Sequence, residues 1–91
     1  MSIRWTRAAD QDLDEIKTYI AQARPGAEMR VADELLVSVT RLATYPTLGR
    51  AGRVPGTREW VLSELPFILV YRVLDEDLQI LRVLHTARRW P

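Results

Sequence analysis

The chain has 91 residues, which predicts a single domain spanning residues 1–91. Its 47% hydrophobic and 27% charged residues, with a net charge of +1, exclude a disordered chain. The absence of cysteine excludes disulfides and thiolate metal sites, and we expect no metal or cofactor. Residues 1–5 contain no long apolar run, so we expect no signal peptide, and no stretch approaches ~18 apolar residues. These features predict a cytoplasmic protein without a membrane span.

The first predicted element is a short strand over residues 2–6, because apolar and polar residues alternate there. Ile3 and Trp5 share one face of this strand. Thr6 is a suitable N-cap for a helix over residues 8–23. The apolar residues of this helix recur at spacings of three and four, which gives it one apolar stripe: Ala9, Leu13, Ile16, Ile20 and Ala23.

A second helix is predicted over residues 26–44, after a break at Pro25. Its apolar stripe has the same spacing and consists of Val31, Leu35, Val39 and Leu42. The two helices form a hairpin whose apolar faces require a partner surface.

Three strands are predicted to supply that surface, at residues 58–63, 67–74 and 78–85. The connection at residues 75–77 is short enough only for an antiparallel hairpin. The predicted fold is therefore α+β with the order β-α-α-β-β-β, a helical hairpin packed on a small, twisted and largely antiparallel sheet.

The segment between the second helix and the next strand, residues 46–57, is rich in glycine and contains Arg50 and Arg53. It has no Gly-Lys-Ser/Thr and does not open a helix, so it is not a phosphate-binding P-loop. Two interpretations stay open, a simple connector or a basic binding loop. The basic residues of the whole chain invite the same question, because Lys17 is the one lysine among 13. Arginine grips phosphate or carboxylate with two hydrogen bonds, although a GC-rich genome also favours arginine.

Several segments resemble, in the correct order, the toxins of the RelE/ParE family. The first-helix residues 13–20, the second-helix exit at 42–49, the loop at 52–59 and the strands at 69–73 and 80–85 carry the likeness. The resemblance implies the toxin of a type II toxin–antitoxin system, held inactive by an antitoxin encoded by an adjacent gene. The RelE branch cuts messenger RNA on the ribosome, whereas the ParE branch blocks DNA gyrase.

Metal-independent RNA cleavage needs a base, an acid and cations near the phosphate. If the chain is a nuclease, the candidate catalytic residues are His85, Arg82, Arg72 and Arg58.

Alternation along the last two strands predicts where these side chains point. A turn at 75–77 pairs Leu74 with Leu78, Arg72 with Ile80, and Val70 with Arg82. Both arginines are then expected on the side away from the helices and open to a partner. The helix-side set is expected to be Phe67, Leu69, Tyr71, Val73, Leu81 and Val83.

Two features argue against cleavage. Nucleases similar to the RelE branch commonly carry an arginine just before the Leu-Val-Tyr stretch, where this chain has Ile68. His85 is expected on the helix side, away from the arginines. The leading hypothesis is therefore a toxin that binds DNA gyrase. The alternatives are a ribosome-dependent endoribonuclease and a non-toxic member that only binds its antitoxin.

The antitoxin is expected to fold across the surface of the helical hairpin and the small sheet. The sheet has exposed strand edges that are able to accept a strand from a partner. The expected target-binding residues are basic, with one tryptophan in the C-terminal tail: Arg50, Arg53, Arg58, Arg72, Arg82, Arg88, Arg89 and Trp90.

Overall fold

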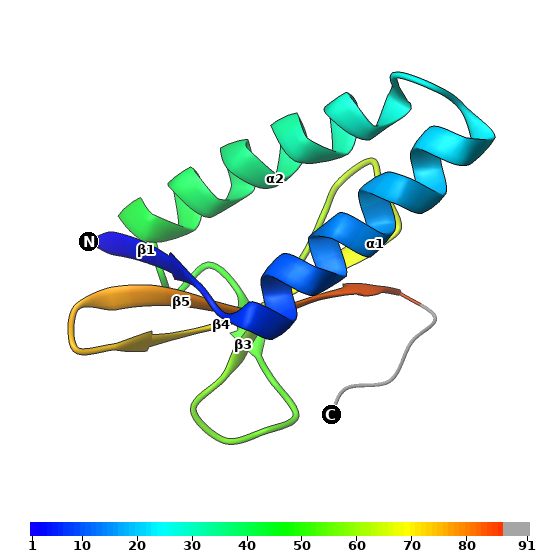
Figure 1. The fold of residues 1–91 in the computed structure, drawn as a ribbon. Helices are drawn as coiled ribbons and strands as arrows, with labels where there is room; N and C mark the ends of the chain where they lie inside the picture. The colour runs from blue at the N-terminus through cyan, green and yellow to red at the C-terminus, as the bar shows by residue number, and fades with distance from the viewer. Residues whose placement is uncertain (87–91) are drawn as a thin grey trace.

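The computed structural model describes residues 1–86, so the predictions on Arg88, Arg89 and Trp90 lie outside the described residues. The elements are β1 (Ser2–Trp5), α1 (Arg7–Ala23), α2 (Ala27–Thr44), β2 (Arg50–Ala51), β3 (Arg58–Val61), β4 (Phe67–Leu74) and β5 (Asp77–His85). Figure 1 shows both helices on one side of the sheet. Within residues 1–86, no helix has the length and apolarity needed to cross a membrane.

The sheet has the strand order β1-β5-β4-β3-β2. β1 runs parallel to β5, and the other neighbours are antiparallel. The α+β prediction is confirmed, with one addition. Two residues of the segment predicted as a loop, Arg50 and Ala51, form β2 against β3. A two-residue strand that is exposed at both positions has no periodicity by which to recognise it.

Helix α1 begins where Thr6 caps it. The Thr6 Oγ1 atom accepts a hydrogen bond from the Ala9 backbone N–H at 3.1 Å. The same hydroxyl lies 3.1 and 3.0 Å from the carbonyl oxygens of Ile80 and Leu81. One residue therefore both starts the helix and fixes its first turn to β5, just beyond the end of β1.

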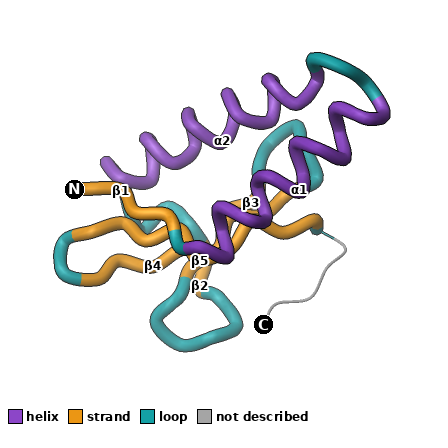
Figure 2. The backbone as a smooth tube through the Cα atoms, in the orientation of Figure 1, coloured by secondary structure: helices purple, strands orange, loops and turns teal. Residues whose placement is uncertain are grey.

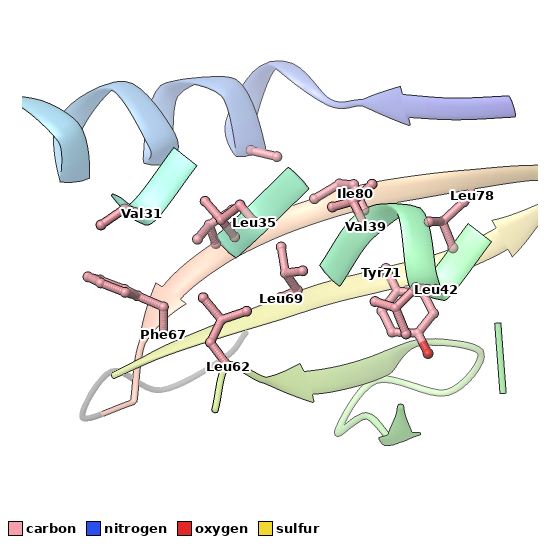
Figure 3. Close-up of a cluster of buried hydrophobic side chains, with 12 residues drawn as sticks. Val31, Leu35, Val39, Leu42, Leu62, Phe67, Leu69, Tyr71, Leu78 and Ile80 are labelled. Atoms are coloured by element: carbon pink, nitrogen blue, oxygen red, sulfur yellow. The ribbon is translucent and has the colours of Figure 1, made fainter. Parts of the chain in front are cut away.

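The core lies between α2 and the sheet. The predicted stripe of α2 is buried at all four positions, Val31, Leu35, Val39 and Leu42. Figure 3 shows these side chains over Leu69, Tyr71, Leu78 and Ile80 of the two central strands. A fully buried aliphatic side chain contributes about 1.5–3 kcal/mol, so this layer orients the sheet beneath the helices.

The predicted register of the β4–β5 hairpin is wrong near its turn. The turn contains only Asp75 and Glu76, both with positive φ (52° and 65°), so Leu74 pairs with Asp77. A two-residue turn of this kind matches the twist of the strands, but it usually carries Asn-Gly or Asp-Gly. Asp75 and Glu76 adopt these angles without glycine, so the sequence does not mark a two-residue turn there.

An irregularity in β5 restores the predicted register further along. Tyr71 pairs with Ile80 and Val70 with Arg82, so Leu81 is an extra residue, a β-bulge. Ile80 and Val83 consequently both reach the core, whereas Leu81 does not. The prediction that Leu81 faces the helices is therefore wrong. Val73 is 45% exposed and also lies outside the core.

Candidate target-binding face

The side of the sheet opposite the helices carries three of the five predicted target-binding arginines that lie within residues 1–86. We call it the helix-free face. It consists of Arg50, Glu59, Ile68, Val70, Arg72, Gln79 and Leu84, with Arg53 from the adjoining loop. A hollow of about 90 Å³ lies between Arg50, Arg53 and the apolar side chains of β4 and β5.

A buried carboxylate orients Arg50. Its Nη2 atom donates to Glu59 Oε1 at 3.0 Å, and the Glu59 side chain is only 8% exposed. Since the two residues pair directly across β2 and β3, the backbone register also fixes their contact. The remaining guanidinium donors stay accessible to an anionic partner, because the Arg50 side chain is 61% exposed.

The loop that carries Arg53 is closed by hydrogen bonds. Gly52 N donates to Thr57 O at 2.8 Å, and the Thr57 hydroxyl donates to Val54 O at 2.6 Å. A Cβ at Gly52 would collide with the Thr57 side chain. Figure 2 shows this loop between β2 and β3 projecting from the sheet on the side away from the helices. The segment predicted as a basic loop is thus closed by hydrogen bonds, and its Arg53 borders the hollow of the helix-free face.

Arg58 has a different environment from the one expected of a target-binding residue. Its Nη1 atom donates to the carbonyl oxygen of Gly49 at 2.8 Å and approaches that of Thr47 at 3.4 Å. The same segment is held by Tyr71, whose hydroxyl donates to Pro46 O at 2.7 Å and accepts from Gly49 N at 2.9 Å. Burial raises the pKa of the Tyr71 phenol. Sequence reasoning missed this role of Tyr71, because an apolar strand gives no sign of a hydroxyl contact to a loop.

Arg72 is exposed, as predicted. Its Nε atom donates to Gln79 Oε1 at 2.9 Å, the residue opposite it on β5. Gln79 also pairs in register with Arg4 of β1, which binds Asp77 at 2.7 Å. Arg4, Gln79 and Arg72 therefore form a cross-strand row, and the alternation of β1 alone did not single out Arg4.

Arg82 is not open to a partner, and that prediction is wrong. Its Nε and Nη2 atoms donate to the two carboxylate oxygens of Asp12 on α1, at 2.7 and 2.9 Å. Asp12 also accepts the Val83 backbone N–H at 3.0 Å. The hydrogen bond to Asp12 raises the pKa of Arg82. Because β1 ends opposite Ile80, α1 lies directly beside the following residues of β5 and brings Asp12 within reach.

A signal for Asp12 was present in the sequence. It lies three residues after Ala9 and four before Ile16, inside the apolar stripe of the first helix. A carboxylate in that position is buried on folding, and a buried charge requires a partner.

His85 lies on the helix side, as predicted. Its ring meets the edge of Phe67 with centroids 5.7 Å apart. Both residues border a largely apolar hollow of about 380 Å³ against α1, together with Ile16 and Tyr19. His85 is therefore on the other side of the sheet from Arg50 and Arg72.

The helix-free face is suited to binding more than to proton transfer. Among the residues that border its hollow, Glu59 is the one titratable carboxylate, and it is engaged by Arg50. Within residues 1–86, no three His, Cys, Asp or Glu side chains gather into a possible metal site. The arrangement offers fixed guanidinium donors around an apolar floor.

Comparison with known proteins agrees with this architecture. Two curated relatives are similar over most of their length. The protein Y4kP of Sinorhizobium fredii, whose name describes it as a toxin, is 45% identical over 89 residues, 98% of this chain and 92% of that protein. Toxin RelE2 of Caulobacter vibrioides is 38% identical over 84 residues, 92% of this chain and 93% of that protein.

Two solved structures are similar in fold and sequence. One is described as the chromosomal ParDE toxin–antitoxin system of P. aeruginosa, with a TM-score of 0.84, 32% identity, and coverage of 93% of this chain and 95% of that chain. The other is the toxin–antitoxin complex RelBE2 of Mycobacterium tuberculosis, with a TM-score of 0.61, 26% identity, and coverage of 92% and 95%. The family model described as the ParE toxin of type II toxin–antitoxin systems matches residues 3–90. The chain therefore belongs to the ParE toxin family of type II toxin–antitoxin systems.

Proposed function

We propose that this toxin arrests growth by binding DNA gyrase, and that it does not cut messenger RNA. The observation that carries the proposal is the row of residues around Ile68. Ile68 pairs with Val61 on one side and Leu84 on the other, so the position where similar nucleases carry an arginine lies in an apolar row. The side chains of this row supply neither a phosphate ligand nor a proton, and the guanidinium groups of Arg50 and Arg53 beside it do not act as a general base.

The placement of the histidine supports the same proposal. A general base must come within about 2.6–3.2 Å of the proton that it removes. His85 borders the α1 side of the sheet, whereas Arg50, Arg53 and Arg72 belong to the helix-free face. The groups needed for cleavage are thus divided between two surfaces, while the groups needed for binding an acidic partner are together.

We further propose that a cognate antitoxin, encoded by an adjacent gene, holds the toxin inactive. The similar solved structures are described as toxin–antitoxin assemblies, and this chain has the same fold. Co-expression with the neighbouring gene followed by size exclusion tests this partner. A toxin that elutes alone in the presence of that gene product would contradict it.

The target is tested with purified gyrase and with RNA from induced cells. We expect the wild-type chain to block supercoiling and to leave transcripts intact in primer extension. Arg72→Ala should relieve the block. A matched control is Arg24→Ala at the exposed end of α1, which removes the same charge outside the helix-free face and should leave inhibition unchanged.

The alternative functions predict other results. Codon-phased cuts with unaffected gyrase would assign the chain to messenger RNA cleavage, which the likeness to Toxin RelE2 keeps as the second candidate. Normal growth, intact transcripts and active gyrase in cells that contain the folded toxin would identify a member that only binds its antitoxin.

A further inference from the structure

Helix α2 has apolar residues on its outer side as well as on its buried side. Met29 and Val37 are 67% and 68% exposed, although each lies within a helix whose opposite face already fills the core. Figure 1 shows α2 at the outer edge of the molecule, with no other helix or strand of residues 1–86 beyond it. A helix that is apolar on both sides is expected where a second surface packs against it.

The residues between these apolar side chains have an ordered pattern. Every fourth residue of the helix, Met29, Asp33, Val37 and Arg41, is exposed, and the C-cap residue Tyr45 continues this spacing just beyond the helix end. We call these five residues the α2 outer stripe. The sequence along the stripe is apolar, acidic, apolar, basic, aromatic. Reversed about Val37, it places the acid opposite the base and Met29 opposite Tyr45.

The two charges of the stripe cannot satisfy each other within one chain. Asp33 and Arg41 are eight residues apart, about 12 Å along a helix with a rise of 1.5 Å per residue. Neither residue forms an ion pair in the described part of the chain. The guanidinium of Arg41 instead lies 5.7 Å from the ring centroid of Trp60, which holds it beside the stripe.

We propose that the α2 outer stripe is a docking surface for a second copy of this chain. The two α2 helices cross antiparallel on a two-fold axis at Val37, so that Asp33 of one protomer binds the partner's Arg41, and the reverse. A two-fold interface repeats each contact, so one complementary pair supplies two ion pairs. Helices that pack through lines of every fourth residue cross at about −50°, which concentrates contact on the central three positions.

The surroundings of the stripe fit such a contact. A hollow of about 290 Å³ borders Asp33, Val37, Arg41 and Trp60, and it offers room for a side chain of the partner. A single helix pair buries less than the roughly 1,200 Å² typical of stable complexes, so the association is weak and depends on concentration. The exposed ion pairs mainly determine which alignment of the helices forms.

A charge exchange between the two positions tests the proposal and does not depend on the toxin's target. Asp33→Arg brings two pairs of like charges together in its own dimer, and so does Arg41→Asp. Mixed in equal amounts, the two variants restore both opposite-charge pairs in a heterodimer. The double variant D33R/R41D restores both opposite-charge pairs between two identical protomers.

We expect sedimentation over about a hundredfold range of concentration to show dimers for the wild type and for the double variant. Each single variant should remain monomeric, and native mass spectrometry of their mixture should show the heterodimer. Asp14→Arg and Arg24→Asp change the same charges at exposed positions of α1 and its end, and should leave dimerisation intact. Circular dichroism of each variant confirms that the helices are retained.

Three results would overturn the proposal. The first is a monomeric wild type throughout the concentration range. The second is a mixture of the two single variants that associates no better than either alone, because the two-fold pairing is then absent. The third is a monomeric wild type whose capture by the antitoxin is lost on Asp33→Arg, which would assign the stripe to the antitoxin.

Discussion

Replacing Asp12 by alanine should destabilise the protein more than its place on a surface helix implies. Two partners lose their acceptor, the Val83 N–H and the Arg82 guanidinium. Val83 is 2% exposed, and a buried donor left without an acceptor costs about 1–3 kcal/mol. The Arg82 side chain is 30% exposed, so solvent screens its loss and only about 1 kcal/mol is added.

Together these terms amount to roughly 2–4 kcal/mol. In a domain of this size 1 kcal/mol lowers the melting temperature by about 4–8 °C, so thermal denaturation followed by circular dichroism should show a fall of roughly 10–30 °C. Asp12→Asn should cost less, because the amide oxygen still accepts the Val83 N–H.

Arg82→Ala provides the second half of a double-mutant cycle. It should cost less than Asp12→Ala, since the Asp12 carboxylate keeps its bond to Val83 and gains partial access to water. The double variant should be little worse than Asp12→Ala alone. Additive losses, or a melting temperature of Asp12→Ala within a few degrees of wild type, would refute the role given to Asp12.

The other predictions concern the helix-free face, the loop and the α2 outer stripe. Arg72→Ala should abolish growth arrest in induced cells and change the melting temperature by less than about 2 °C, because Arg72 is exposed; a large loss of stability with toxicity retained would contradict this. Tyr71→Phe should cost about 1–3 kcal/mol in urea unfolding, since Gly49 N and Pro46 O lose their partner. The pKa of Tyr71 is raised above 10.0 in the folded chain, so the contribution of the Tyr71 hydroxyl to the free energy of unfolding is complete below that pH and is lost as pH rises through the folded pKa. Tyr71→Phe should lack this loss of stability at alkaline pH. Gly49→Ala should also destabilise the protein, because its Cβ would lie 2.9 Å from Glu59 O and collide with Tyr71, and an unchanged urea midpoint would show that the loop adapts. Asp33→Arg should keep growth arrest while losing dimerisation. Loss of both would show that the α2 outer stripe, like the helix-free face, is needed for growth arrest.

The sequence was sufficient to predict the elements in which apolar residues recur at regular spacing. The stripes of both helices were visible at spacings of three and four, and every predicted stripe position of α2 is buried. The apolar run of β4 indicated a central strand, and β4 lies between β3 and β5. Periodic burial is a property of many residues together, so one unusual residue does not conceal it.

Single-residue irregularities were not predictable in the same way. The two-residue turn at Asp75 and Glu76 uses positive φ without glycine, and the bulge at Leu81 reverses the faces of the residues before it. Each shifts alternation by one position, and a shift of one moves a strand's side chains to the other face. The errors cancelled at Arg82, whose pairing with Val70 was predicted correctly although its contact with Asp12 was not.

The candidate site was predictable in composition but not in contacts. Arg50, Arg53 and Arg72 were recognised as basic residues of a loop and a strand, and they lie on the helix-free face. Arg58 was included with them, but it donates to carbonyl oxygens within the chain. Whether an arginine stays accessible to a partner depends on which acceptor lies near it after folding. For Arg58 that acceptor is the carbonyl oxygen of Gly49, nine residues earlier in the chain.

The position of the α2 outer stripe has a consequence for the proposed target. The two helices cover one side of the sheet, and the arginines of the helix-free face lie on the other. In a dimer joined through α2, the two helix-free faces point away from the two-fold axis and both remain accessible. Such a dimer offers two identical binding faces, and linked binding exceeds the affinity of either face alone where one target molecule can reach both faces at once. Asp33→Arg should therefore retain growth arrest but require more toxin to reach it, whereas Arg72→Ala should lose arrest and still form the dimer. Equal potency of wild type and Asp33→Arg at every level of induction would show that one face is sufficient.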